Sequence, residues 1–121
     1  MVVKSLIFSF TLSLLLFFNQ VYAENIIGKP KIIDGDTIHI DKNKIRLHAI
    51  DAPETKQKCT KKKIEWNCGL QSTEFLKTLI GNDQIECITN GKDKYNRYIG
   101  VCYKNDLDLN REMVINGWAI A

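Results

Sequence analysis

The chain has 121 residues and a formal net charge of +3, with 45% hydrophobic and 26% charged residues. A chain of this length favours one domain rather than several, and the absence of internal repeats and low-complexity linkers excludes repeat architectures. The small positive charge is compatible with a polyanionic partner but does not by itself indicate one.

The first 23 residues have the pattern of a secretory signal peptide. Lys4 precedes an apolar run from Leu6 to Phe18, and a small-residue pattern ends at Ala23. A basic end, an apolar core of about 7–15 residues and such a cleavage site are typical of signal peptides. A membrane anchor is the alternative, but a bilayer span takes about 20 apolar residues. We therefore expect cleavage after Ala23, which exports the domain 24–121 to the periplasm or the medium.

The exported domain opens with three predicted strands. Ile32 and Ile33 form the first, before an Asp-Gly-Asp-Thr turn at 34–37. Residues 37–40 and 45–50 alternate apolar with polar side chains, which predicts two half-buried strands. The polar turn between them predicts a hairpin.

A long loop and a helix follow. Residues 55–67 show no periodicity, and loops of this length are usually functional or held by a cross-link. The helix is predicted from Gly69 and ends at Gly81, a residue that commonly terminates helices. Its predicted apolar face comprises Leu70, Phe75, Leu76, Leu79 and Ile80.

Two more strands and a short helix complete the predicted domain. The strands occupy 84–89 and 98–103, joined by a polar connection at 90–97. The helix is predicted to begin at Asn110 as its cap and to stop at Gly117, burying Met113, Val114 and the region of Trp118.

The order of these elements predicts the fold class. Strand, strand, strand, helix, strand, strand matches an α+β, mainly β, OB-fold: a five-stranded barrel with its helix between strands 3 and 4. A short C-terminal helix is added. OB-folds commonly bind oligonucleotides, but a fold alone does not give a function.

All four cysteines lie in the predicted exported domain, at 59, 68, 87 and 102. An even number in a small exported chain indicates disulfides. Three pairings are possible, and we favour Cys59–Cys68, which would close the long loop, with Cys87–Cys102, which are equidistant from the centre of the last hairpin. Zinc is the competing explanation, but there is no C-x-x-C pair and only two histidines, so zinc is not favoured.

Three short motifs carry the chemistry: Asp-Gly-Asp-Thr at 34–37, Arg46 with Asp-Ala-Pro-Glu at 51–54, and Asp-Lys-Tyr-Asn-Arg at 93–97. Each alone has an ordinary explanation, as a turn, a surface arginine or a hairpin tip. In this order and around this strand pattern, they resemble the thermonuclease (staphylococcal-nuclease-like) family. The resemblance runs from about Ile32 to Trp118.

The resemblance implies Ca²⁺ as the cofactor. It implies Asp36 and Asp51 as carboxylate ligands and the backbone carbonyl of Ala52 as a third ligand. Many family members have threonine at the position of Ala52, and a carbonyl ligand tolerates that change. Ca²⁺ takes about 6–8 oxygen ligands, so waters and a phosphate oxygen would complete the shell. Asp34 matches a nearby acid with a structural role.

The resemblance also implies a catalytic set. Glu54 would act as general base on a water, and Arg46 and Arg97 would bind phosphate oxygens with their planar donors. Lys94 and Tyr95 would contact the nucleotide, by a phosphate contact and by packing. Because stacking is sequence-tolerant, we expect little sequence specificity. The resemblance implies an endonuclease for DNA or RNA that leaves 3′-phosphate ends.

Several alternatives remain open. Family members usually continue beyond the position of Ala121 with a third helix, so the domain is expected to be short at its C-terminus and to lack that helix. A module that binds nucleic acid without cutting, or a truncated inactive remnant, would also fit such a sequence. The lysine-rich segment 56–63 fits a solvated loop as well as a guide for the polyanion. We expect a monomer with no stable protein partner.

Overall fold

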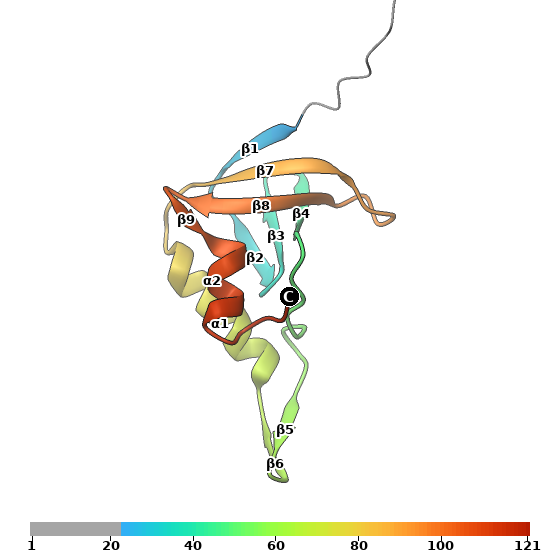
Figure 1. Ribbon diagram of the computed structural model, residues 1–121, viewed down its shortest axis with the longest axis vertical. Helices are drawn as coiled ribbons and strands as arrows, with labels where there is room; N and C mark the ends of the chain where they lie inside the picture. The colour runs from blue at the N-terminus through green and yellow to red at the C-terminus, as the bar shows by residue number, and fades with distance from the viewer. Residues whose placement is uncertain (1–22) are drawn as a thin grey trace, which may run out of the picture.

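One curled β-sheet with two helices against it makes up residues 23–121, the part of the chain that the computed structural model describes (Figure 1). The predicted signal peptide, apart from Ala23, lies outside the described residues. The sheet runs in the order β1-β7-β8-β4-β3-β2, with β9 added to β8, and β5 pairs separately with β6. The elements are β1 (Glu24–Gly28), β2 (Lys31–Asp34), β3 (Thr37–Ile40), β4 (Asn43–Leu47), β5 (Cys59–Lys61), β6 (Ile64–Trp66), α1 (Cys68–Ile80), β7 (Ile85–Lys92), β8 (Tyr98–Lys104), β9 (Leu107–Asp108) and α2 (Leu109–Ile115).

The N-terminal segment pairs with both ends of the sheet. β1 pairs with β7 and β2 pairs with β3, both antiparallel, and only Lys29 and Pro30 separate β1 from β2. Gly28 is required at this bend, because a Cβ there would lie 2.7 Å from Ile40 Cγ2. With β1 and β2 taken as two halves of one bent strand, the predicted five-stranded OB arrangement is confirmed. Sequence reasoning missed the β1 half.

The middle of the sheet places the first two motifs side by side. β3 pairs antiparallel with β4, so that Thr37 faces Arg46. β4 pairs parallel with β8, with Ile45 opposite Tyr98. Parallel neighbours need a long crossover, and here it contains the β5–β6 hairpin, α1 and β7.

Helix α1 begins and ends as predicted, within one residue. Gly81 follows it at φ 63° and donates its N–H to the Lys77 carbonyl. Leu76 and Ile80 are buried, but Leu70 is 44% exposed, so its predicted place on the buried face was wrong. The first turns of α1 bury Gly69, Ser72 and Thr73 instead; small and polar residues fit there because the segment after β4 packs closely against them.

Residues 55–67 were predicted to form an irregular loop. They contain the β5–β6 hairpin instead. Cys59 pairs with Trp66 and Lys61 with Ile64, and Lys62 and Lys63 turn the chain at positive φ. The hairpin extends away from the barrel (Figure 1). Its short strands have no buried face, so the period-two pattern of a half-buried strand is absent.

Helix α2 begins at Leu109, so its cap lies two residues before the predicted cap, Asn110. Asp108 caps it by accepting the Arg111 backbone N–H at 2.9 Å. Asn110 is buried within the helix: its amide accepts the Cys102 N–H and donates to the carbonyls of His48 and Gly100. Sequence reasoning predicted Asn110 as the cap and missed its buried role, because its hydrogen-bond partners lie outside the helix.

Both predicted disulfides are present, Cys59–Cys68 and Cys87–Cys102. Cys87 and Cys102 face each other across β7 and β8 in the buried core. No helix of the described residues is long and apolar enough to span a bilayer. The core lies inside the curl of the sheet and beneath both helices, and comprises Ile26, Ile38, Ile40, Ile45, Leu47, Ile50, Ala52, Leu76, Ile80, Ile85, Cys87, Cys102, Leu109, Met113 and Ala119.

Candidate active site

Arg46 is the centre of the site that the first two motifs build. Its Nη2 lies 3.4 Å from Asp36 Oδ2 and 3.4 Å from Asp51 Oδ1. Its Nη1 donates to the carbonyls of Leu47, at 3.0 Å, and Ile50, at 2.8 Å. The guanidinium therefore holds two carboxylates together and also fixes the chain that leads from β4 to Asp51.

Asp36 attaches the 51–54 segment to the barrel. Only 6% of this residue is exposed, and its Oδ1 accepts the Thr37 hydroxyl while its Oδ2 accepts the Ala52 N–H, both at 2.8 Å. The structure thus places Ala52 directly against the buried carboxylate. Asp51 differs: its side chain is 74% exposed, and its backbone pairs with Ile120.

The backbone of Glu54 is held although its side chain is exposed. The Gln57 N–H donates to the Glu54 carbonyl at 2.8 Å, and the Gly69 N–H donates to the Gln57 carbonyl at 3.1 Å. A Cβ at Gly69 would overlap the Glu54 carbonyl oxygen, so the start of α1 packs directly on this segment. The carboxylate of Glu54 is free to meet a substrate while its anchor is fixed.

Asp34 has the structural position that the sequence indicated. Its Oδ1 accepts both the backbone N–H and the hydroxyl of Thr55, each at 2.7 Å. The Thr55 hydroxyl also lies 2.8 Å from that of Thr73 on α1. This network fastens the residue after Glu54 to β2 and to α1.

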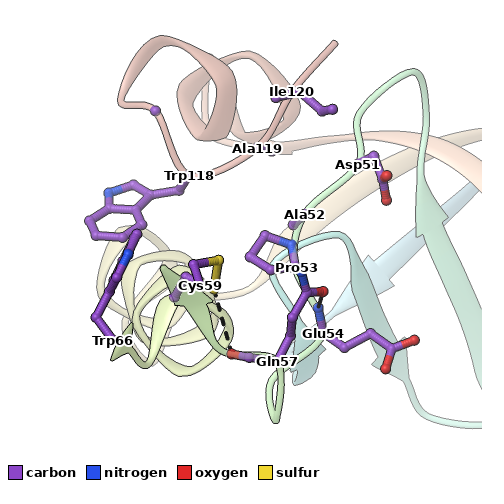
Figure 2. Close-up of a pocket in the computed structure, with 12 residues that line it drawn as sticks. Asp51, Ala52, Pro53, Glu54, Gln57, Cys59, Trp66, Trp118, Ala119 and Ile120 are labelled. Atoms are coloured by element: carbon purple, nitrogen blue, oxygen red, sulfur yellow. Dashed lines mark hydrogen bonds between the residues drawn. A yellow bond between two sulfur atoms is a disulfide. The ribbon is translucent and has the colours of Figure 1, made fainter. Parts of the chain in front are cut away.

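A pocket of about 520 Å³ adjoins the 51–54 segment. Figure 2 shows the carboxylates of Asp51 and Glu54 on one side of that segment, and Trp66 and Trp118 on the other side, across the pocket. The segment thus separates an acidic face from an aromatic hollow.

The third motif forms the tip of the β7–β8 hairpin. Arg97 Nε donates to Asp93 Oδ2 at 2.8 Å, and Asp93 Oδ1 accepts the backbone N–H of Tyr95 and of Arg97. The cations of Lys94 and Arg97 lie 5.1 Å and 5.4 Å from the Tyr95 ring centroid. Partial burial alone would raise the pKa of Asp93, but the hydrogen bonds and charge of Arg97 and the Tyr95 N–H outweigh it and lower this pKa.

The predicted residues therefore form two groups. Asp36, Arg46, Asp51 and Ala52 are in direct contact. Among the described residues, no hydrogen bond or ion pair joins the hairpin-tip residues Lys94, Tyr95 and Arg97 to that cluster. The parallel register nevertheless sets Arg46 opposite Ile99 on β8, the strand that begins directly after Arg97.

The oxygen donors at Asp36, Asp51 and Ala52 suit a hard cation such as Ca²⁺. In residues 23–121 no group of three or more histidine, cysteine, aspartate and glutamate side chains is arranged to hold a metal. A cation here would rest on two carboxylates and a carbonyl, and both carboxylates lie 3.4 Å from the same Arg46 nitrogen.

Sequence reasoning missed the residues that support the site from behind. Gln57 and Thr73 hold the 54–55 segment, and Trp66 and Trp118 line the pocket. Thr73 and its neighbour Ser72, two polar residues on an otherwise apolar helix face, were the available signal. Trp66 carried none, because the hairpin that places it was not predicted.

Comparison with known proteins identifies the family. The staphylococcal nuclease homologue family matches residues 44–121. The chain is 36% identical over 101 residues to the succinoglycan biosynthesis protein ExoI of Rhizobium meliloti, covering 81% of this chain and 53% of that protein. It is 35% identical over 118 residues to an uncharacterized endonuclease of Haemophilus influenzae, covering 90% and 61%.

A third relative is Endonuclease YhcR of Bacillus subtilis, 32% identical over 102 residues that make up 74% of this chain and 8% of that protein. The chain thus spans a little over half the length of the first two relatives. The family match includes Arg46, the 51–54 motif and the hairpin-tip motif, around which the site is built. The chain therefore belongs to the family of staphylococcal nuclease homologues.

Proposed function

We propose that the protein is an exported, Ca²⁺-dependent endonuclease that hydrolyses phosphodiester bonds of DNA or RNA with little sequence specificity. The observation that carries the proposal is the contact of Arg46 with both Asp36 and Asp51, beside a segment that presents Glu54. Family membership and the endonuclease names of two relatives support the same activity.

Asp36, Asp51 and the Ala52 carbonyl would hold the metal ion. When bound, Ca²⁺ supplies Lewis-acid stabilisation of the negative charge that develops on the phosphate. Two carboxylates close together favour a cation between them, and among residues 23–121 only Arg46 makes an ion pair with them. A bound cation would share that task and leave the guanidinium donors available for phosphate oxygens.

Glu54 would act as general base. It takes a proton from a water that attacks phosphorus; the bond from phosphorus to the 5′-oxygen breaks, and that oxygen leaves as a hydroxyl after taking a proton from solvent water. The products carry 3′-phosphate and 5′-hydroxyl ends. Arg46 and Arg97 offer planar pairs of donors to the phosphate oxygens, where lysine would offer a point charge. Donors fixed in advance stabilise charge where it grows.

Lys94 and Tyr95 would position the nucleotide at the hairpin tip. Tyr95 is 64% exposed, so its ring can stack on a base of any kind. Export through a signal peptide cleaved after Ala23 agrees with the start of β1 at Glu24 and with the two disulfides, since disulfides persist in oxidising compartments. We expect the protein to act as a monomer.

Replacing Glu54 with glutamine tests the proposal. Glutamine keeps the shape of the side chain but cannot accept the proton, so Glu54→Gln should abolish cutting in the presence of Ca²⁺ while binding of uncut nucleic acid persists. Glu112→Gln, a change on α2 away from the site, is the control and should cut like the parent. If Glu54→Gln cuts as fast as the parent, the general-base role is wrong. If the folded parent binds nucleic acid and does not cut it, the chain is a binding module instead.

A further inference from the structure

We propose that the protein holds a single-stranded stretch of its substrate on a second surface beside the active site. This surface, the tryptophan–lysine groove, comprises Trp66 and Trp118 together with Lys61, Lys62 and Ile64 of the β5–β6 hairpin. The inference rests on the proposed nuclease function and names the form of nucleic acid that the site receives.

The two hollows of the groove adjoin each other at Trp66, which lines both. Trp66 lies in the wall of the 520 Å³ pocket beside the 51–54 segment, and it also lines a hollow of about 290 Å³ with Lys61, Lys62 and Ile64. Strand pairing explains this arrangement. Lys61 pairs with Ile64. Because alternate strand residues share a face, Ile64 and Trp66 lie on the same side of the hairpin. The disulfide Cys59–Cys68 fastens the base of the hairpin to α1.

The indoles leave room for a base. Trp66 and Trp118 meet edge to face, with ring centroids 6.5 Å apart and planes at 62°, so they do not cover each other by stacking. Phe75 of α1 supports Trp118 from behind, at 5.8 Å. The pocket of about 520 Å³ beside the two indoles falls within the range of about 300–1,000 Å³ that is usual for small-ligand sites. Both rings are half-buried, which fixes them in place and leaves part of each accessible.

The charge of the hairpin favours a polyanion. Lys58 is paired with Glu65 at 3.2 Å, whereas Lys61, Lys62 and Lys63 make no ion pair with any described residue. Ile64 beside them is 70% exposed. Unpaired lysines next to exposed apolar and aromatic side chains are the combination that binds single-stranded nucleic acid, the lysines along its backbone and the rings against its bases.

The position of the groove explains why the strand must be unpaired. The Asp51–Glu54 segment has its carboxylates on one side and the two indoles on the other (Figure 2). A strand that presents its phosphate to Glu54 can place a neighbouring nucleotide across this segment in the aromatic pocket. Bases in a duplex are stacked on one another and paired, so they cannot offer a face to an indole without being extruded. The groove therefore selects unpaired regions of the substrate.

Tryptophan fluorescence gives a direct readout, because the chain contains two tryptophans and both line the groove. The full protein, in a chelator so that cutting does not occur, is titrated with a single-stranded oligothymidylate of about 12 nucleotides and with a duplex of the same length. We expect quenching by the single strand and at least about tenfold weaker binding of the duplex.

Two changes test the groove residues separately. Trp66→Ala and the double change Lys61→Gln/Lys62→Asn should each weaken single-strand binding about tenfold or more, as measured by fluorescence anisotropy of a labelled strand. Asparagine tolerates the positive φ of Lys62. The double change should also lower the slope of log affinity against log salt by about 1.4, since each of two single-strand phosphate contacts contributes about 0.7. Lys29→Gln/Lys31→Gln, which removes two exposed lysines elsewhere, should change neither quantity.

Cleavage of the single strand in Ca²⁺, measured alongside, separates this inference from the nuclease proposal. If the protein cuts but both groove variants bind like the parent, or if the duplex binds as tightly as the single strand, the groove proposal is overturned and the nuclease stands. If single-strand binding depends on the groove but nothing is cut, the nuclease proposal fails and the groove stands as a binding site.

Discussion

Arg46 is the residue on which the geometry of the site depends. It contacts two carboxylates and two backbone carbonyls at once, so that one side chain organises both the carboxylate pair Asp36 and Asp51 and the chain leading to Asp51. Five donors in a fixed plane can do this, and a lysine ammonium cannot.

Arg46→Lys should therefore lower the turnover number by about 100-fold or more, which is the usual effect of removing a positioned donor at a reacting phosphate or carbonyl. Single-turnover cleavage at saturating Ca²⁺ measures it. Arg111→Lys, on the exposed side of α2, is the matched control and should cut at the parental rate. Equal rates for the parent and Arg46→Lys would show that the bridging guanidinium has no catalytic role.

Asn110 has a comparable importance for stability rather than chemistry. Its buried amide joins α2 to β8 and to the turn after β4. Asn110→Ala removes these partners, and a buried polar group left unsatisfied costs about 1–3 kcal/mol. We expect about 3 kcal/mol less stability by urea unfolding. Asn116→Ala, at an exposed position, should change it by less than about 0.5 kcal/mol.

At the scale of elements, the hairpin that carries Arg97 is organised by Asp93. The lowered pKa of Asp93 means that the ionised carboxylate is favoured by the folded hairpin. A carboxyl whose pKa is lower in the folded state contributes stability above its unfolded pKa, and this contribution is lost as pH falls through the folded value. Its stabilising effect is therefore present at neutral pH and disappears in acid.

Asp93→Asn should be less stable than the parent near pH 6, and the difference should shrink as the pH falls below the ordinary value of 3.8. Urea unfolding at several pH values measures it, with NMR titration of the Asp93 carboxyl, whose midpoint should lie below 3.8. Asp106→Asn, in the exposed turn before β9, should show no such trend. A midpoint above 3.8 would contradict the assigned hydrogen bonds.

The disulfide Cys87–Cys102 cross-links the same hairpin, closing a loop with a sequence separation of 15. Replacing both cysteines with alanine should lower stability by about 3 kcal/mol in the chain-entropy model. Urea unfolding of the variant, with Cys59–Cys68 intact, measures this loss. A loss well below 1 kcal/mol would show that the pairing across β7 and β8 suffices to hold the hairpin.

Elements with a buried face could be predicted from the sequence, and those without one could not. The strands around Ile38 and Ile45 and the helix that ends before Gly81 appear where their apolar periodicity placed them. The β5–β6 hairpin has exposed strands and a Lys62-Lys63 turn, so that neither alternation nor a glycine turn marks it. The cluster of Asp36, Arg46 and Asp51 came from matching motifs, because no local pattern shows that distant carboxylates meet.

In the whole molecule, the elements that close and cover the barrel also hold the candidate site in place. β1 and β2 join the two ends of the sheet, and the chain from Asp34 onward then leads directly into the Asp36 turn. Helix α1 packs on the segment bearing Glu54, through Gly69 and Thr73. The acidic face and the aromatic pocket of the tryptophan–lysine groove thus lie on opposite sides of one segment, residues 51–54, which lies outside the helices and named strands (Figure 2).

The measurement that tests the central claim most directly is degradation of nucleic acid by the purified, oxidised protein, with Ca²⁺ and then with excess chelator. The account predicts endonucleolytic fragments with 3′-phosphate ends in Ca²⁺, and their loss on chelation or in Glu54→Gln. A folded protein that leaves DNA and RNA intact in Ca²⁺, or one that cuts equally well in chelator, would contradict it.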